Sequence, residues 1–376
     1  MFRPTCFFAA LLGLAGSALA QTTPAIQSLT ALGTLGGPTS RAYAVNDAGQ
    51  ITGYSVDASN HQHAFIYSGG VMTDINPVAA TGTSYGNSIN NSGTVVGYAQ
   101  VGATVTPFSY SGGTATDLTS VLGSPAYPRG INDGGMIAGG LSAAGFTFAG
   151  GSVTTLPAGS TALAINNAGV AVGSIANNNF TAVHAASFVN GVATDLGLLS
   201  GKTNSLATAV NSSGAIVGYS YTNAFDDVAF LYQNATLMSL GTLGGSHAKA
   251  QGINDAGDVV GFGSPPAGGT DHAFLYRDGT MYDLNTLAAS FLVAGPVGAD
   301  TVGWTSLNYA YDINNSGLIV GWGNYAVGNW TVYSRAFALQ LANASPVPEP
   351  AQASLFLGLV ILGLARGSRR RRTAHR

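Results

Sequence analysis

Helix-forming and redox-active residues are scarce in this chain. Of its 376 residues, one is cysteine (Cys6) and one is glutamate (Glu349). Because Cys6 lies near the N-terminus, ahead of the apolar stretch at residues 7–14, the body of the chain has neither a disulfide nor a thiol nucleophile. Only 8% of the residues are charged. Since helices draw on Glu, Lys and Leu, this composition disfavours a helical fold.

Positive charge is also scarce once the two ends are set aside. Between residues 21 and 345 the chain has six basic and fifteen acidic residues, all of them Asp, which gives a net charge of −9. We therefore expect no nucleic-acid partner and no affinity for anionic membrane surfaces in this part. An enzyme of the carboxylate-pair type would have to use two aspartates.

Glycine and apolar residues are plentiful: there are 53 glycines, and 46% of the residues are apolar. This combination predicts an all-β fold rich in turns. A pattern of aliphatic-Asn-x-x-Gly-x-aliphatic-x-Gly occurs seven times, first at Val45 to Gly53. Its intervals of 44, 42, 34, 45, 43 and 60 residues are typical of propeller blades with four strands each.

Asn followed three residues later by Gly predicts a hairpin with a type I turn and a glycine at positive φ. Asp312 precedes one copy and makes it resemble a calcium loop, but Ala44, Ser88 and others hold that place elsewhere, so structural turns are the better interpretation. The predicted turn pairs are Asn46 and Gly49, Asn90 and Gly93, Asn132 and Gly135, Asn166 and Gly169, Asn211 and Gly214, Asn254 and Gly257, and Asn314 and Gly317.

A second repeated element, His-Ala-Phe, follows the hairpin at His63 and His272, and a third, Gly-Thr-Leu-Gly-Gly, begins at Gly33 and Gly241. Together these motifs resemble the HAF repeat of extracellular bacterial proteins, over roughly residues 30–341. That family is defined by its repeats, so the resemblance implies a location and no catalytic residue. With His184, these histidines sit blades apart, which disfavours a shared metal site and favours hydrogen bonding between blades.

The repeats predict a seven-bladed β-propeller over residues 21–343. The last copy lacks its outer strand, and a strand-like run at residues 25–32 precedes the first copy. If that run completes the seventh blade, the ring closes without an open sheet edge. A β-solenoid is the alternative architecture, although it needs capping repeats that the sequence does not show.

The N-terminus has the pattern of a signal peptide over residues 1–20. Arg3 precedes an apolar stretch at residues 7–14, and Ala18-Leu19-Ala20 has the small-x-small pattern of a signal peptidase site. We expect Sec-dependent export and a mature chain that begins at Gln21.

The C-terminus, residues 344–376, has the pattern of a sorting tail. Val347-Pro348-Glu349-Pro350 is followed by an apolar run, residues 351–365, expected to be a short membrane-spanning helix, and then by arginines. This order resembles the PEP-CTERM signal that exosortases read in Gram-negative bacteria. The resemblance implies an exosortase-like partner, transient inner-membrane anchoring, and delivery to the cell envelope or beyond. An ordinary single-pass anchor remains the alternative.

No motif for a cofactor or metal stands out. The seventh copy has an insertion, and Trp304, Tyr309 and Trp330 in or near it are candidates for a ligand-binding rim. The alternative is that both tryptophans cover hydrophobic surface. We therefore expect a non-enzymatic surface or matrix protein that binds extracellular polysaccharide or a surface protein. A glycan-active enzyme is the alternative, with its carboxylates among the aspartates that do not recur in the repeat: Asp226, Asp227, Asp271 and Asp300.

Overall fold

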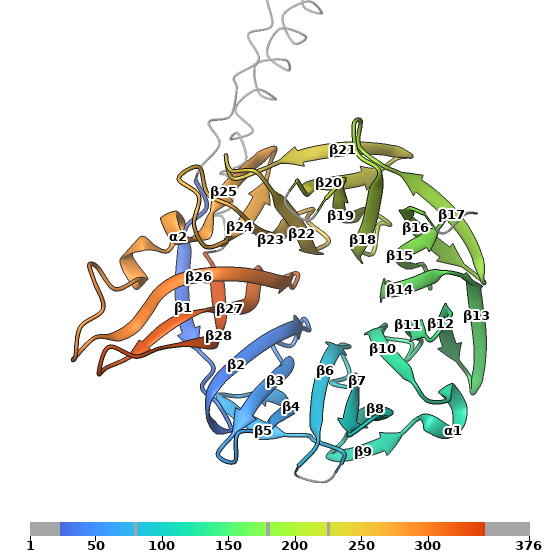
Figure 1. Ribbon diagram of the computed structural model, residues 1–376, viewed down its shortest axis with the longest axis horizontal. Coiled ribbons are helices and arrows are strands. Elements are labelled where there is room, and N and C mark those ends of the chain that lie inside the picture. The colour runs from blue at the N-terminus through green and yellow to red at the C-terminus, as the bar shows by residue number, and fades with distance from the viewer. Residues whose placement is uncertain (1–22, 79–80, 178–180, 224–225, 343–376) are drawn as a thin grey trace, which may run out of the picture.

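The protein is a seven-bladed β-propeller (Figure 1). The computed structural model describes residues 23–78, 81–177, 181–223 and 226–342. In them, seven antiparallel sheets of four strands each are arranged around a central axis. The predicted propeller is therefore confirmed, and the solenoid alternative is wrong. The expected signal peptide, and the sorting tail with its apolar helix, lie outside the described residues.

The first six blades each take four consecutive strands, with the first strand of each nearest the axis. Blade 1 consists of β2 (Gly36–Val45), β3 (Ile51–Asp57), β4 (Gln62–Ser68) and β5 (Val71–Asp74), and blade 2 of β6 (Thr83–Ile89), β7 (Val95–Val101), β8 (Thr104–Ser111) and β9 (Thr114–Asp117). Blade 3 consists of β10 (Ala126–Ile131), β11 (Ile137–Leu141), β12 (Ala144–Ala149) and β13 (Ser152–Ala158), and blade 4 of β14 (Ser160–Ile165), β15 (Ala171–Ala176), β16 (Val183–Val189) and β17 (Val192–Gly197). Blade 5 consists of β18 (Asn204–Val210), β19 (Ile216–Tyr221), β20 (Val228–Gln233) and β21 (Thr236–Gly241), and blade 6 of β22 (Ala248–Ile253), β23 (Val259–Gly263), β24 (His272–Arg277) and β25 (Thr280–Asp283).

Blade 7 is built from both ends of the described chain. It consists of β26 (Val302–Ile313), β27 (Leu318–Val327), β28 (Val332–Leu341) and, on the outside, β1 (Ile26–Ala31). Strand β1 runs antiparallel to β28, and the backbone N–H of Ala342 donates to the carbonyl of Ala25 at 2.9 Å. The run at residues 25–32 therefore closes the ring, as the sequence predicts.

One phenylalanine in the third strand of each blade forms the centre of the packing. All seven are at most 1% exposed, and Phe146, rather than Phe148, takes this place in blade 3. Burying such a ring stabilises the fold by about 1.5–3 kcal/mol. The glycine of the second strand makes room for it: a Cβ on Gly218 would lie 1.9 Å from the carbonyl oxygen of Leu206 and 2.8 Å from Phe230 Cζ. The seven residues are Phe65, Phe108, Phe146, Phe188, Phe230, Phe274 and Phe337.

The repeated histidines form pairs within a blade. His63 Nδ1 lies 2.7 Å from Asp74 Oδ2, and His272 Nδ1 lies 2.7 Å from Asp283 Oδ2. The same pair in blade 4 joins His184 and Asp195 at 2.8 Å. These contacts tie the start of the third strand to the end of the fourth, so the expected bonding between blades is corrected to bonding inside each blade.

The described chain has little helix. It comprises the single turns α1 (Thr119–Leu122) and α2 (Leu284–Leu287) and the 3-10 turn η1 (Ala289–Phe291). None of the helices in the described part is long and apolar enough to cross a membrane. Both α2 and η1 belong to the predicted insertion, which then continues into the long strand β26.

Candidate functional site

The repeat asparagines organise their own hairpins. In blade 1, the side-chain oxygen Oδ1 of Asn46 accepts from the backbone N–H of Gln50 at 2.8 Å, and the N–H of Gly49 donates to the carbonyl of Asn46 at 3.0 Å. Gly49 has φ +75°, and the glycines at the equivalent place in the other six blades also have positive φ. This geometry is the three-residue hairpin that the pattern predicts.

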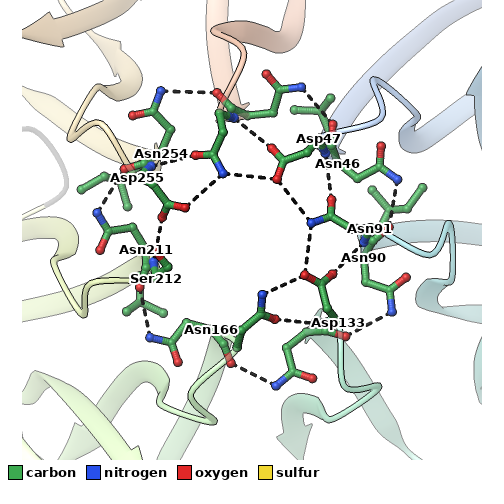
Figure 2. Close-up of a pocket in the computed structure, with 18 of the residues that line it drawn as sticks. Asn46, Asp47, Asn90, Asn91, Asp133, Asn166, Asn211, Ser212, Asn254 and Asp255 are labelled. Atoms are coloured by element: carbon green, nitrogen blue, oxygen red, sulfur yellow. Dashed lines mark hydrogen bonds between the residues drawn. The ribbon is translucent and has the colours of Figure 1, made fainter.

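The same asparagines also join the blades to one another. Each side-chain amide nitrogen Nδ2 donates to the backbone carbonyl of the repeat asparagine in the next blade, at 2.9–3.3 Å. The bond from Asn314 to Asn46 completes the circle, and Figure 2 shows this ring around the axis. All seven asparagines are buried, so this ring of hydrogen bonds has a structural role and holds the blades together at this end of the propeller.

A second polar ring lies beside the first, formed by the residues that follow the repeat asparagines. Asn91 Nδ2 donates to carboxylates on both sides, to Asp47 at 3.3 Å and to Asp133 at 3.1 Å. Asn315 bridges Asp47 and Asp255 in the same way, at 3.2 and 3.0 Å. The polar groups at this mouth are therefore engaged mainly with one another.

A cleft between blades 6 and 7 has a different character. Its volume is about 740 Å³. Its floor is a row of three partly exposed aromatic rings, Phe262, Tyr309 and Trp322. The centroids of Phe262 and Tyr309 are 4.0 Å apart, and Tyr309 stacks on Trp322 at 4.7 Å and 14°. The guanidinium of Arg41 from blade 1 covers Trp322, 4.3 Å from its centroid.

The strand pattern explains why these rings meet. Phe262 and Trp322 each stand three residues after the start of the second-strand motif, at Val259 and Ile319, and Tyr309 lies in the first strand of blade 7. Residue Trp322 is directly opposite Tyr309 in the β26–β27 ladder. Because side chains alternate between the faces of a strand, these three positions point to the same side of their blades.

Asp271 is the centre of the polar wall of the cleft. His247 Nε2 lies 2.8 Å from its Oδ1, and the hydroxyl of Tyr309 donates to its Oδ2 at 3.1 Å. The side-chain amide of Asn308 donates to its backbone carbonyl at 3.0 Å. Burial, together with the charge of Asp271, raises the pKa of Tyr309 to about 12, so this hydroxyl remains protonated near neutral pH.

Asp227 and Lys249 supply a second charged pair to the same cleft. Asp227 is 2% exposed, and its Oδ2 lies 3.4 Å from Lys249 Nζ. Burial raises the pKa of the Asp227 carboxyl, and the ammonium of Lys249 partly opposes that effect. Lys249 Nζ also lies 4.6 Å from the centroid of Tyr219. The cleft therefore combines an aromatic floor with two carboxylates, an imidazole and an ammonium.

The structure places the three predicted rim residues in different surroundings. Trp304 is 4% exposed and packs edge-on against Tyr325 and Phe337, so its placement on an exposed rim was wrong. The insertion pairs with β27 and draws Trp304 into the blade core. Trp330 is 73% exposed in the β27–β28 turn, but it does not line the cleft. Tyr309 does line it.

Two of the four aspartates that do not recur in the repeat, Asp227 and Asp271, line the cleft. Asp226 instead pairs with Lys202 at 3.1 Å, and backbone amides lower its pKa to about 2. Phe262, Trp322 and Lys249 also line the cleft and were not among the residues predicted for a site. A signal was present, because an aromatic residue stands at the same second-strand position in five of the seven blades: Tyr54, Tyr98, Tyr219, Phe262 and Trp322.

Comparison with known proteins gives no family. No family model matches the chain, and no curated protein matches it. Among solved structures, it is similar to the extracellular domain of a one-component system from B. thetaiotaomicron, with a TM-score of 0.46 and 10% identity over 84% of this chain and 40% of that one. The chain thus spans less than half of that protein's length.

Two further likenesses are more distant. One is a gluconolactonase from Xanthomonas campestris, with a TM-score of 0.32 and 11% identity over 60% of this chain and 92% of that one. The other is an arginine-to-alanine triple mutant of AofleA from Arthrobotrys oligospora, with a TM-score of 0.34 and 12% identity over 71% of this chain and 92% of that one. These similarities carry no argument about ligand or activity.

Proposed function

We propose that this protein is an exported interaction module that binds a glycan in the cleft between blades 6 and 7. One observation carries the proposal: the partly exposed row of Phe262, Tyr309 and Trp322 lies beside a wall of polar side chains in one cleft. Sugars present apolar ring faces and many hydroxyl groups. An aromatic floor with a few placed polar groups suits such a ligand.

The polar wall offers both kinds of hydrogen-bonding partner. Asp271 presents acceptor oxygens, and Asn324 and Lys249 carry N–H donors. Asp271 is held by His247 and Tyr309, so its orientation is fixed before a ligand arrives. Such preorganisation reduces the entropy that binding would otherwise cost.

A glycan array followed by calorimetry with the purified protein tests this proposal. Trp322→Ala should weaken binding at least tenfold, because it removes one of the three rings of the aromatic row and the partner on which Tyr309 stacks. Trp330→Ala is the matched control, since this exposed tryptophan lies outside the cleft. The proposal fails if the protein binds no glycan, or if both variants bind as tightly as the unchanged chain. Capture of a surface protein instead would point to the alternative class of partner.

A glycan-active enzyme is the second candidate, because two aspartates that do not recur in the repeat line the same cleft. Asp227 is a reasonable proton donor, since burial raises the pKa of its carboxyl, and Asp271 would be the second carboxylate. Incubation with the glycans that bind, followed by an assay for new reducing ends, tests this. Activity lost in both Asp227→Asn and Asp271→Asn would support an enzyme, whereas intact glycans would support a binding module.

The proposal that the protein is exported and sorted rests on the sequence patterns at the two ends of the chain. We propose that the signal peptide is removed after Ala20 and that an exosortase-like enzyme removes the apolar segment at residues 351–365. The mass of the protein purified from the native cell tests both steps. A mature chain that still contains residues 351–376 would show that this segment is a lasting anchor.

A further inference from the structure

We propose that the axial cavity next to the cleft is an anion subsite, which binds a carboxylate-bearing sugar unit of the same glycan chain. The preferred ligand is then an acidic polysaccharide that contains uronate. This inference rests on the proposed function and adds a ligand class and a second site to it. Its central residue is Arg129 on β10.

The axial cavity has a volume of about 430 Å³. Seven of its lining residues occupy one repeat position, two residues before the aliphatic residue of the turn motif. The turn position is asparagine in all seven blades, whereas this position has six different residue types. A purely structural role would favour the same residue in each blade. The seven residues are Tyr43, Asn87, Arg129, Leu163, Thr208, Gln251 and Tyr311.

Arg129 has no carboxylate within ion-pair distance in the part of the chain that the structure describes. Its side chain is exposed, and its guanidinium carbon lies 5.8 Å from the ring centroid of Tyr98 and 6.0 Å from that of Tyr127. By contrast, Lys202, Lys249 and Arg277 each pair with an aspartate. An uncompensated cation in a body of net charge −9 indicates a place for an external anion.

Arg41 adds a second cation near the boundary between the cavity and the cleft. It too has no ion-pair partner among the described residues, and its buried Nε has no hydrogen-bond partner there. Its guanidinium stacks on Trp322 in the cleft. A planar guanidinium binds carboxylate in a bidentate geometry, which an ammonium does not reproduce.

A continuous row of rings joins the two sites. Tyr309 in the cleft lies 6.1 Å from Tyr311, and Tyr311 lies 5.3 Å from Tyr43, centroid to centroid. Tyr311 and Tyr43 both line the axial cavity. A sugar chain seated on the cleft floor can therefore continue over these rings and bring its next units to Arg129.

The channel is charged differently along its length. The carboxylates of Asp47, Asp133 and Asp255 lie at the mouth formed by the turns. Arg129 lies on β10, three positions before the turn residue Asn132, and three residues span about 10 Å along a strand. An anion that enters the cavity over Tyr43 and Tyr311 reaches Arg129 before it meets the ring of aspartates. Repulsion from those carboxylates then limits how far the anion enters the channel.

Calorimetry with matched sugars tests the subsite. Oligomers of polygalacturonate, alginate and glucuronan are titrated into the full protein, each beside its carboxyl-reduced, neutral form. We expect an acidic oligomer to bind at least tenfold more tightly than its reduced form, and added salt should narrow that difference. Arg129→Gln should remove most of this difference in affinity, because the reduced form has no charge for Arg129 to bind. Arg335→Gln is the control, because this arginine lies outside both cavities.

The outcomes separate the two proposals. If no sugar in the array or the panel binds, the proposed glycan-binding function fails. If a sugar binds but acidic and reduced forms bind equally, the anion subsite is wrong and the cleft proposal stands. An acid preference that is undiminished in Arg129→Gln also overturns the subsite assignment. So does an Arg335→Gln variant whose acid preference falls as much as that of Arg129→Gln.

Discussion

The side-chain amide of Asn314 donates a 2.9 Å hydrogen bond to the backbone carbonyl of Asn46, joining two blades that are 268 residues apart in sequence. Local turn chemistry and ring closure therefore depend on one residue type. The oxygen of each side chain shapes its own hairpin, and the nitrogen binds the next blade. A substitution that keeps one of these roles and removes the other can distinguish them.

Asn46→Asp should destabilise the propeller by about 1–3 kcal/mol. The aspartate can still accept from the N–H of Gln50, but it no longer donates to the carbonyl of Asn90 and brings a negative charge against that buried oxygen. Chemical denaturation measures the change. Asn190→Asp, in an exposed turn, is the control. Equal stability of Asn46→Asp and the unchanged protein would show that closure does not depend on these amides.

Removal of residues 25–31 should lower the melting temperature and cause self-association. Without β1, the ten-residue strand β28 becomes an open sheet edge, which is able to pair with another molecule. Light scattering measures the mass, and calorimetry measures the melting temperature. A chain that lacks only residues 21–24 should keep the mass of the unchanged protein. An unchanged mass for the longer deletion would contradict closure by β1.

The two tryptophans of the predicted rim should behave differently. Trp304→Ala should reduce the free energy of unfolding by about 3–5 kcal/mol, because it leaves a cavity between Tyr325 and Phe337. Trp330→Ala should change it by less than about 0.5 kcal/mol, since the side chain is exposed. Denaturation curves of the two variants test these predictions. Similar losses in the free energy of unfolding would contradict the exposed position of Trp330.

Asp312 should make stability depend on pH. Its Oδ2 accepts from the N–H of Val45 in blade 1 at 3.0 Å, and burial raises the pKa of its carboxyl from 3.8 to about 7. Between those values the folded state holds a proton that the unfolded state has released, so stability falls as pH rises and levels off above about 7.

Asp312→Asn should remove this dependence. At about 1.4 kcal/mol per pKa unit, the variant gains at most about 4 kcal/mol at pH 8. We expect less than that maximum, because Asp312 keeps some contact with solvent. The two proteins should be nearly equal at pH 4. Unfolding measured at pH 4, 6 and 8 tests the prediction, and parallel curves for the two proteins would show that this carboxyl does not titrate in that range.

The architecture was accessible from the sequence because it repeats. Seven copies of one hairpin motif identify the blades, and the missing outer strand of the last copy shows where the N-terminal strand belongs. The single buried phenylalanine per blade follows from the same repeat. These features depend on spacing along the chain, which a single sequence displays directly.

The site was less accessible because it depends on contacts between blades. Asp227, Asp271 and Tyr309 were singled out as residues outside the repeat, but nothing along the chain indicates that they line one cleft. Phe262 and Trp322 occupy a position that carries an aromatic residue in several repeats, so nothing along the chain distinguishes these two. Trp304 was misplaced because an insertion suggests a loop, whereas this one extends the strands of its blade and buries the ring.

The closing of blade 7 also has a mechanical consequence. The chain leaves the propeller from β28, which is hydrogen-bonded to β27 on one side and to β1 on the other. A force applied beyond residue 342 therefore loads an interior strand, and two ladders must break before that strand can be drawn out. A protein held at its C-terminal end in flowing medium would be anchored by one of the most firmly bound strands in the ring.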